Sequence, residues 1–225
     1  VVDSSRSGSS VLEYNNEGYF FRGQYDYDNR IYFSGSYRRD ASSRFHPDHR
    51  WGNFWSLGAA WIINRESWFN ASWVNMLKVK ASYGSQGNDK IGNYRYVDTY
   101  RLASSNGEMS VAFLQKGNPN ITWETNTNFN AGIEFGVLQN RISGSIEYFN
   151  RKTTDMLMAF PTAPSLGYSS YYANVGDMSN KGIEIDLNFT PIRSKNVQWD
   201  ISVNLTHLKN KITLLPPERR TLQVD

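Results

Sequence analysis

The sequence predicts an all-β fold, an antiparallel transmembrane β-barrel built from long strands, and three observations lead to this prediction. Apolar and polar residues alternate with a period of two, which is the side-chain periodicity of a strand. The alternation often continues for about ten residues, which is the length of a membrane-crossing strand, whereas ordinary strands have about five or six. Short turns and long loops also follow one another along the chain, as they do in outer-membrane barrels.

The composition is that of a packed protein, since 39% of the 225 residues are hydrophobic and 15% are aromatic. The 24 Lys and Arg residues exceed the 21 Asp and Glu residues by only three, and these charges are scattered, so no nucleic-acid-binding patch is predicted. The lack of cysteine excludes disulfides, thiolate metal sites and cysteine nucleophiles. No stretch approaches the roughly 18 apolar residues of a membrane-spanning helix.

The first two expected strands form a hairpin. Residues 19–27 and 31–37 alternate on either side of Asp28-Asn29, a pair of residues that suits a tight turn. The third and fourth expected strands, residues 54–63 and 77–83, are separate runs with the same alternation.

The other expected strands form two more hairpins. Residues 128–137 and 142–148 flank one short turn, and residues 183–190 and 197–206 flank another. The alternation is clearest in residues 183–190. There Ile183, Ile185, Leu187 and Phe189 alternate with Glu184, Asp186, Asn188 and Thr190. About eight strands are therefore expected, with at most a turn of helix at residues 66–73.

The connections alternate in length. The expected short-side connections are residues 28–29, 64–75, 138–140 and 191–196. The expected long loops are residues 39–50, 85–120 and 154–173. The polar side of the strands is rich in Asn, Glu, Asp, Ser and Thr, which suits a water-lined lumen opposite a lipid-facing side, with the long loops outside the cell. A large soluble β-sandwich is the alternative that periodicity alone leaves open.

A series of short motifs runs from Ser36 to Glu184. They are SYRRDASSRF (36–45), WGNFWSLGAAW (51–61), LKVKASYG (77–84) with GN (87–88), NPN (118–120) with WE (123–124) and Asn126, YFNRKTTD (148–155), and NVG (174–176) with NKGIE (180–184). Together, and in this order, they resemble the SusC/RagA-type TonB-linked transporters of the Bacteroidetes outer membrane. Trp55 departs from the family pattern, which more often has proline there, and this leaves the local loop-to-strand geometry open.

The resemblance implies a larger protein. Such transporters have a barrel of about 22 strands around an N-terminal plug. Residues 1–225 are thus expected to be an internal part of the barrel domain, with the plug and the final C-terminal strands absent. Because unpaired backbone groups in lipid cost several kcal/mol each, the remaining barrel and plug polypeptide is expected to complete the structure.

The function implied is TonB-dependent active import of a nutrient, an oligosaccharide or an oligopeptide, by a multi-pass barrel in the outer membrane of a Gram-negative bacterium. The implied partners are a SusD-like surface lipoprotein, the TonB complex, which docks through the missing N-terminal region, and the lipid bilayer. A self-contained small outer-membrane barrel with a structural or adhesion role is one alternative. A soluble β-rich binding module or enzyme is another.

Tyrosines in the long loops are the first candidates for ligand contact, because tyrosine binds sugars and peptides by stacking and hydrogen bonding. They are Tyr94, Tyr96, Tyr100, Tyr168, Tyr171 and Tyr172. Arg38 joins them because it alternates onto the polar side, where it is expected to point into the lumen. Packing of loop on loop is an equally good explanation of the tyrosines.

No catalytic site, metal site or cofactor is predicted. No Ser/His/Asp constellation, paired-carboxylate motif or phosphate-binding loop is visible, so the chain is not expected to be an enzyme. His46, Asp48 and His49 share one loop but lack the spacing of known metal sites. Asp40, Asp89 and Asp98 are carboxylates of loops or strand ends, for which a calcium site is the alternative to the interpretation as solvated loop acids.

Overall fold

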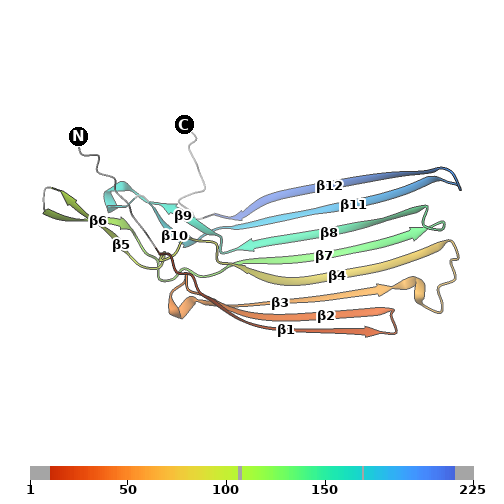
Figure 1. Ribbon diagram of the computed structural model, residues 1–225, viewed down its shortest axis with the longest axis horizontal. Helices are drawn as coiled ribbons and strands as arrows, with labels where there is room; N and C mark the ends of the chain where they lie inside the picture. The colour runs from red at the N-terminus through yellow and green to blue at the C-terminus, as the bar shows by residue number, and fades with distance from the viewer. Residues whose placement is uncertain (1–10, 106–107, 169, 216–225) are drawn as a thin grey trace.

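A computed structural model describes residues 11–105, 108–168 and 170–215, and its main feature is one eight-stranded antiparallel sheet (Figure 1). Its strands are β1 (Asn16–Tyr27), β2 (Ile31–Ser42), β3 (Trp51–Ile62), β4 (Val74–Asn88), β7 (Glu124–Val137), β8 (Ile142–Thr154), β11 (Asp177–Arg193) and β12 (Gln198–Leu214). Each strand pairs with the one before and the one after it in this series. The predicted all-β antiparallel architecture is therefore confirmed.

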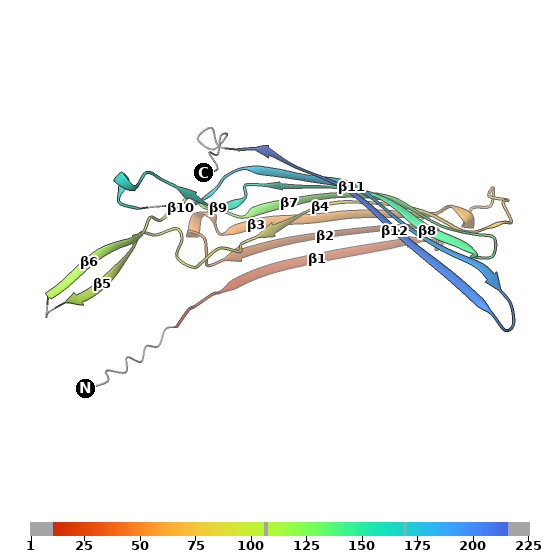
Figure 2. The same cartoon turned by 90° about the horizontal axis from the view of Figure 1, so that it is seen from above.

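Two small hairpins interrupt the series at the loop end of the sheet. One consists of β5 (Thr99–Ser105) and β6 (Glu108–Gln115), and the other of β9 (Leu157–Pro161) and β10 (Ser170–Asn174). In Figure 2 the β5–β6 hairpin extends beyond the end of the main sheet. The expectation of plain loops at these places is wrong, because backbone pairing forms short strands there without long alternation.

The strands are longer than the sequence predicts. The expected strand 31–37 continues to Ser42, and the expected strand 77–83 occupies Val74–Asn88. Polar residues break the apolar alternation near the loops, but the ladder of backbone hydrogen bonds continues past them. Trp55 lies inside β3, opposite Tyr37 of β2, so the strand begins before the position where the family more often has proline.

The short connections lie at the other end of the sheet, which we call the turn end. Asp28 and Asn29 both have positive φ, 53° and 51°, the conformation of the tight hairpin turn that was predicted. The helical turn between β3 and β4 is a 3-10 turn at η2 (Ile63–Arg65), just before the predicted residues 66–73. Two further 3-10 turns, η1 (Pro47–His49) and η3 (Pro164–Leu166), lie in the loops.

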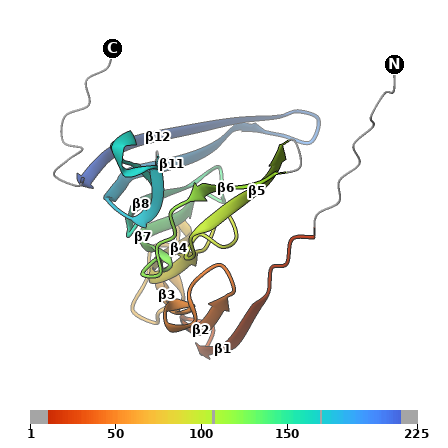
Figure 3. The same cartoon turned by 90° about the vertical axis from the view of Figure 1, so that its left-hand side faces the viewer.

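The main sheet is open. β1 pairs only with β2, and β12 pairs only with β11, so the first and last strands do not close on each other. Seen along the strands in Figure 3, the series β12 to β1 follows an arc. Within the residues that the structure describes, the eight strands therefore form an open, curved sheet and not a closed barrel.

The strand register sorts side chains onto two faces. One row crossing the sheet contains Val79, Ile133, Ile146, Ile185 and Leu205, whereas the adjacent row contains Lys80, Gly132, Glu147, Glu184 and Thr206. We call these sides the apolar face and the polar face. Many large side chains of the apolar face are exposed, among them Phe21, Leu57 and Leu205 at 72%, 60% and 57%. Such a continuous exposed apolar face indicates an interaction with another apolar phase.

The most deeply buried apolar side chains of the described residues lie in the loops, not in the sheet. Phe45 and Ile121 are fully buried and pack with Ile91. Tyr96, Trp123, Leu157 and Tyr172 surround them. We call this group the loop core. In the described part of the chain, none of the helical segments has the length and apolar character needed to span a membrane.

Candidate functional site

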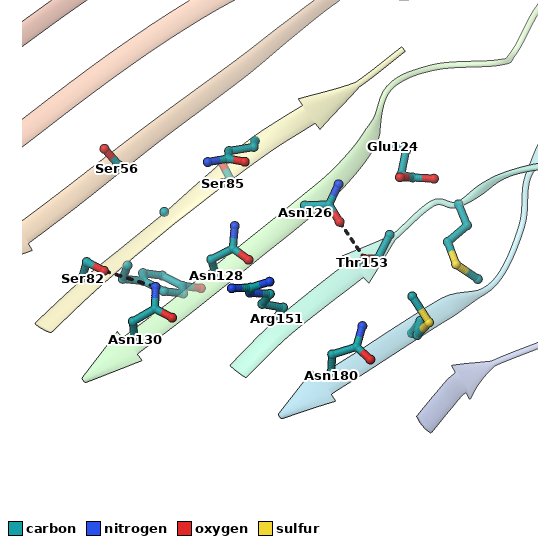
Figure 4. A pocket seen from close by; sticks show the side chains of 15 residues that line it. Ser56, Ser82, Ser85, Glu124, Asn126, Asn128, Asn130, Arg151, Thr153 and Asn180 are labelled. Carbon is teal, nitrogen blue, oxygen red and sulfur yellow. Dashed lines mark hydrogen bonds between the residues drawn. The ribbon is translucent and has the colours of Figure 1, made fainter. Parts of the chain in front are cut away.

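The polar face is hollowed below the loops, over strands β3, β4, β7, β8 and β11 (Figure 4). The hollow has a volume of about 810 Å³. Its polar lining side chains are Ser56, Ser82, Ser85, Gln86, Glu124, Asn126, Asn128, Asn130, Arg151, Thr153 and Asn180. We call it the amide hollow, because asparagines dominate it.

Strand alternation places the asparagines. Asn126, Asn128 and Asn130 are every second residue of β7, so all three side chains leave the same face. Arg151 of β8 lies directly opposite Asn128, and Asn180 of β11 lies directly opposite Arg151. Figure 4 shows the Arg151 side chain among these amides.

Some of these amides are occupied and others are free. The Thr153 hydroxyl donates to the Asn126 amide oxygen at 2.7 Å, and the Asn130 amide donates to the Ser82 hydroxyl at 3.4 Å. Within the described residues, the side-chain amides of Asn128 and Gln86 make no hydrogen bond. The hollow therefore offers unused donors and acceptors.

Arg151 is the only lining residue of the hollow with a positive charge. Its guanidinium lies 5.4 Å from the ring centre of Phe149 and forms no ion pair among the described residues. The only lining carboxylate, Glu124, is engaged elsewhere, because its two oxygens accept from the Asn88 amide at 2.9 Å and the Leu157 backbone N–H at 3.1 Å. Arg151 is thus available to a ligand.

The turn half of the polar face is organised differently. Glu134 of β7 accepts from Lys78 at 3.1 Å and from Lys80 at 3.0 Å, both on β4. Lys80 also reaches Glu147 of β8 at 2.8 Å. It does so across Gly132, the β7 residue between them in the register, which has no side chain in the way. We call these four residues the charged chain.

Arg38 is on the polar face, as predicted, near the loop end of β2. Its Nε donates to both carboxylate oxygens of Asp40, at 2.7 and 2.5 Å. The pair borders a second hollow of about 470 Å³ that also includes Phe20 and Phe54. Unlike Arg151, Arg38 already has a carboxylate partner.

Three of the predicted tyrosines gather on the two loop hairpins. Tyr100 packs on Phe113 with ring centres 5.4 Å apart, and Phe113 packs on Tyr168 at 6.0 Å. Tyr171 continues the series, at 6.5 Å from Tyr168 and 5.8 Å from Phe160. We call these five rings the aromatic series. It connects β5–β6 with β9–β10.

The other three predicted tyrosines have different surroundings. Tyr96 and Tyr172 belong to the loop core, and the Arg95 guanidinium lies 4.5 Å from the ring centre of Tyr172. Tyr94 is 48% exposed and has a positive φ of 60°. For Tyr96 and Tyr172, the structure shows the loop-on-loop packing that the sequence left as an alternative.

Two carboxylates fix the loops above the polar face. Asp89 accepts from the hydroxyls of Tyr14 at 2.9 Å and Ser42 at 2.6 Å, and burial together with Asp89 raises the pKa of Tyr14. Asp98 accepts from the backbone N–H of Gly117 at 2.8 Å and from Lys116 at 3.2 Å. These two contacts, the backbone one first, hold the pKa of Asp98 below its ordinary value.

Asn126, Asn128, Arg151 and Asn180 are not among the site residues predicted from the sequence. A usable signal is present, since asparagine occurs at every second position from Asn126 to Asn130 of β7. Among the described residues there is no group of three or more His, Cys, Asp or Glu side chains that suits a metal ion. The His46 and His49 rings are 6.5 Å apart.

Comparison with known proteins gives a consistent result. The family model for the β-barrel of TonB dependent receptor-like proteins matches residues 2–221. TonB-dependent receptor SusC of Bacteroides thetaiotaomicron is 34% identical over 207 residues, which are 88% of this chain and 21% of the relative. TonB-dependent receptor P39 of Formosa agariphila is 32% identical over 196 residues, 86% of this chain and 19% of the relative. The chain thus spans about a fifth of these relatives.

Solved structures are similar as well. The structure of the RagAB peptide transporter aligns with a TM-score of 0.86 and 33% identity, covering 92% of this chain and 23% of that chain. The siderophore receptor PirA from Pseudomonas aeruginosa aligns with a TM-score of 0.61 and 18% identity, over 88% of this chain and 32% of that chain. At that identity the second similarity concerns the fold alone.

Proposed function

Since the chain belongs to the family of TonB-dependent receptor-like β-barrels, we propose that it forms part of the wall of an outer-membrane transporter that actively imports an oligosaccharide or an oligopeptide. The observation that carries this proposal is the contrast between the two faces of the sheet. The apolar face is exposed over its whole width, and the polar face holds a hollow with unused hydrogen-bonding groups. A wall between lipid and an aqueous lumen requires both.

The amide hollow is the proposed place of ligand contact within this wall. Amides and hydroxyls hydrogen-bond equally well to sugar hydroxyls and to peptide groups, so they suit both nutrient classes. Asn128 and Gln86 are the free amides, and Arg151 adds a positive charge between Asn128 and Asn180. Of the residues predicted from sequence, Tyr100, Tyr168 and Tyr171 are a proposed stacking surface above the hollow, and Arg38 a proposed lumen residue.

The rest of the transporter is proposed to come from polypeptide outside these residues. Within the described residues, β1 and β12 each have one edge without a partner strand, and in lipid those backbone groups would cost several kcal/mol each. Further strands are proposed to close the barrel around a plug. A SusD-like lipoprotein on the outer side and the TonB complex in the periplasm are the proposed partners. The open edges also argue against a self-contained eight-stranded barrel.

A transport assay with the full-length protein tests the proposal. Cells without the gene are supplied with the wild-type gene, and uptake of labelled maltoheptaose, laminarin oligosaccharides and casein peptides is measured with and without a proton uncoupler. Uptake of at least one probe is expected to depend on both the gene and the proton gradient. A protein that is present in the outer membrane but changes the uptake of none of these probes would contradict the import proposal.

A matched pair of variants tests the hollow. Asn128→Leu removes a free amide from the hollow. Asn188→Leu removes an amide on the polar face of the turn half, where its oxygen accepts from the Ser202 hydroxyl at 2.7 Å. Loss of one ligand hydrogen bond of about 1 kcal/mol lowers affinity about fivefold, so the half-saturating concentration for uptake should rise by that factor in Asn128→Leu only. Equal effects of the two variants would remove the hollow from the ligand path.

A further inference from the structure

Four lysines gather on the apolar face, at the loop end of the sheet. Lys181 of β11 lies directly opposite Lys209 of β12. In the next row, Ser179 of β11 lies between Lys152 of β8 and Lys211 of β12. Because residues opposite each other in an antiparallel pair point to the same side, the four lysines form one patch. We call it the lysine patch.

The patch holds more positive than negative charge. Side chains directly opposite each other on antiparallel strands have their Cβ atoms about 5 Å apart, where like charges are destabilising. The Asp177 carboxylate lies 3.7 Å from the Lys152 ammonium. Within the described residues, Lys181, Lys209 and Lys211 have no ion-pair partner. A repulsive arrangement of this kind indicates an anion that is not part of the chain.

The position of the patch indicates which anion. The row next to Lys181 and Lys209 contains Tyr148, Ile183 and His207, and the row after it contains Ile146, Ile185 and Leu205. The lysines therefore border the exposed apolar face on its loop side. In the proposed membrane orientation this border is the surface of the outer leaflet, where lysine stems cover apolar surface and their ammonium groups reach the head groups.

We propose that the lysine patch binds the phosphate-bearing head group of a lipid in the outer leaflet. The acyl chains of such a lipid would lie along the apolar face while the phosphate contacts the ammonium groups. One lipid molecule would therefore cover apolar surface and neutralise the lysine patch. Lysine suits this partner because it binds phosphate as a compact point charge. The inference rests on the proposed membrane placement, and it adds a lipid site that is separate from the ligand path on the polar face.

The test uses the full-length protein purified in a neutral detergent. Binding of diphosphorylated lipid A is measured by native mass spectrometry, with the same lipid after enzymatic removal of its phosphates as the comparison. The variant is Lys181→Gln with Lys209→Gln. The matched control is Arg193→Gln with Lys195→Gln, which removes two positive charges from the turn end of the same β11–β12 hairpin.

We expect wild type and control to bind the phosphorylated lipid, and the Lys181/Lys209 variant to bind it at least tenfold more weakly, since each lysine near a charged lipid surface contributes about 1 kcal/mol. The dephosphorylated lipid should bind all three proteins equally weakly. Equal binding of the phosphorylated lipid by all three proteins, or equal binding of both lipids by wild type, would overturn the proposal.

A second measurement separates binding from folding. In lipid-free detergent the Lys181/Lys209 variant should unfold at the same urea concentration as wild type or at a higher one, because the substitution removes repulsion. A lower midpoint would mean that the lysines stabilise the chain itself, which contradicts the proposal. If the lipid-site proposal is wrong, the lipid-binding measurement shows it, and uptake and outer-membrane location are unaffected. If the proposed function is wrong, the uptake assay shows it.

Discussion

The two halves of the polar face use polar residues in opposite ways. In the turn half, Lys78, Glu134, Lys80 and Glu147 pair with one another across three strands at 2.8 to 3.1 Å. In the loop half, the amide hollow contains amides and an arginine for which the described part of the chain offers no hydrogen-bond or acid partner. The four charges of the charged chain are neutralised within the wall, and hydrogen-bonding groups in the loop half remain available to a ligand.

The difference shows that a polar wall is not uniformly a binding surface. The side chains of the charged chain are between 26% and 35% exposed, so they are partly removed from water and need partners of opposite charge. Amides carry no net charge, and an unpaired amide that faces water costs little. Substitutions in the turn half should therefore change stability, and substitutions in the loop half should change ligand binding.

The largest expected effect on stability is that of Glu134→Lys, which replaces the shared acid of the charged chain by a third lysine. Loss of two half-buried ion pairs and the new repulsion should lower the free energy of unfolding by about 2 kcal/mol. This figure lies between the contribution of an exposed ion pair and the cost of breaking a buried one. The measurement is urea unfolding of the full-length protein in micelles.

Glu184→Lys is the control for that change. Glu184 lies directly opposite Glu147, so the same charge reversal one strand pair away replaces an acid–acid pair by an acid–lysine pair. Stability should stay the same or rise. If both reversals lowered stability equally, the charged chain would have no special role, and the contrast between the two halves would lose its basis.

A smaller effect is expected from double-mutant cycles. The cycle for Lys80 and Glu147 should give a coupling energy of about 0.5 to 1 kcal/mol, as for partly exposed ion pairs. The equivalent cycle for Asn128 and Arg151, which lie directly opposite each other on neighbouring strands, should give a value close to zero. A large coupling in the second pair would show that the hollow is held together internally.

The smallest effect concerns the loops above the hollow. Because the pKa of Asp98 is lowered in the folded protein, its contribution to stability is present above the ordinary aspartate pKa of 3.8 and is lost as the pH falls through the lower folded value. Protonation should weaken its contacts with Gly117 and Lys116. Hydrogen-exchange protection of the Gly117 amide should fall at pH 3 relative to pH 6, after correction for intrinsic rates, and Asp98→Asn should abolish this difference.

Much of the sheet could be predicted from the alternation. The strand containing Ile183 and Ile185 was found with the correct faces, and the Asp28-Asn29 turn was found at the correct place. The strand ends were predicted too short, and β5, β6, β9 and β10 were missed. Near the loops, polar residues occur on both faces, so the period-two pattern disappears although the backbone still pairs.

The candidate site was predicted less well than the fold. The tyrosines were chosen by residue type and loop position, and the structure divides them between the aromatic series, the loop core and the separate Tyr94. Arg151 could not be predicted as a site residue, because in the sequence nothing distinguishes it from the neighbouring Lys152. Its lack of an acid partner is visible only once its neighbouring strands are known.

The all-β class, the division of each strand into an apolar and a polar face, and, through the ordered motifs, the family could all be predicted from the amino-acid pattern alone. These are local properties, since alternation and turn residues act over a few positions. Which side chains meet became clear from the folded sheet. Lys80 reaches Glu147, and Arg151 lies between Asn128 and Asn180, because the register between strands brings together residues that are far apart in the chain.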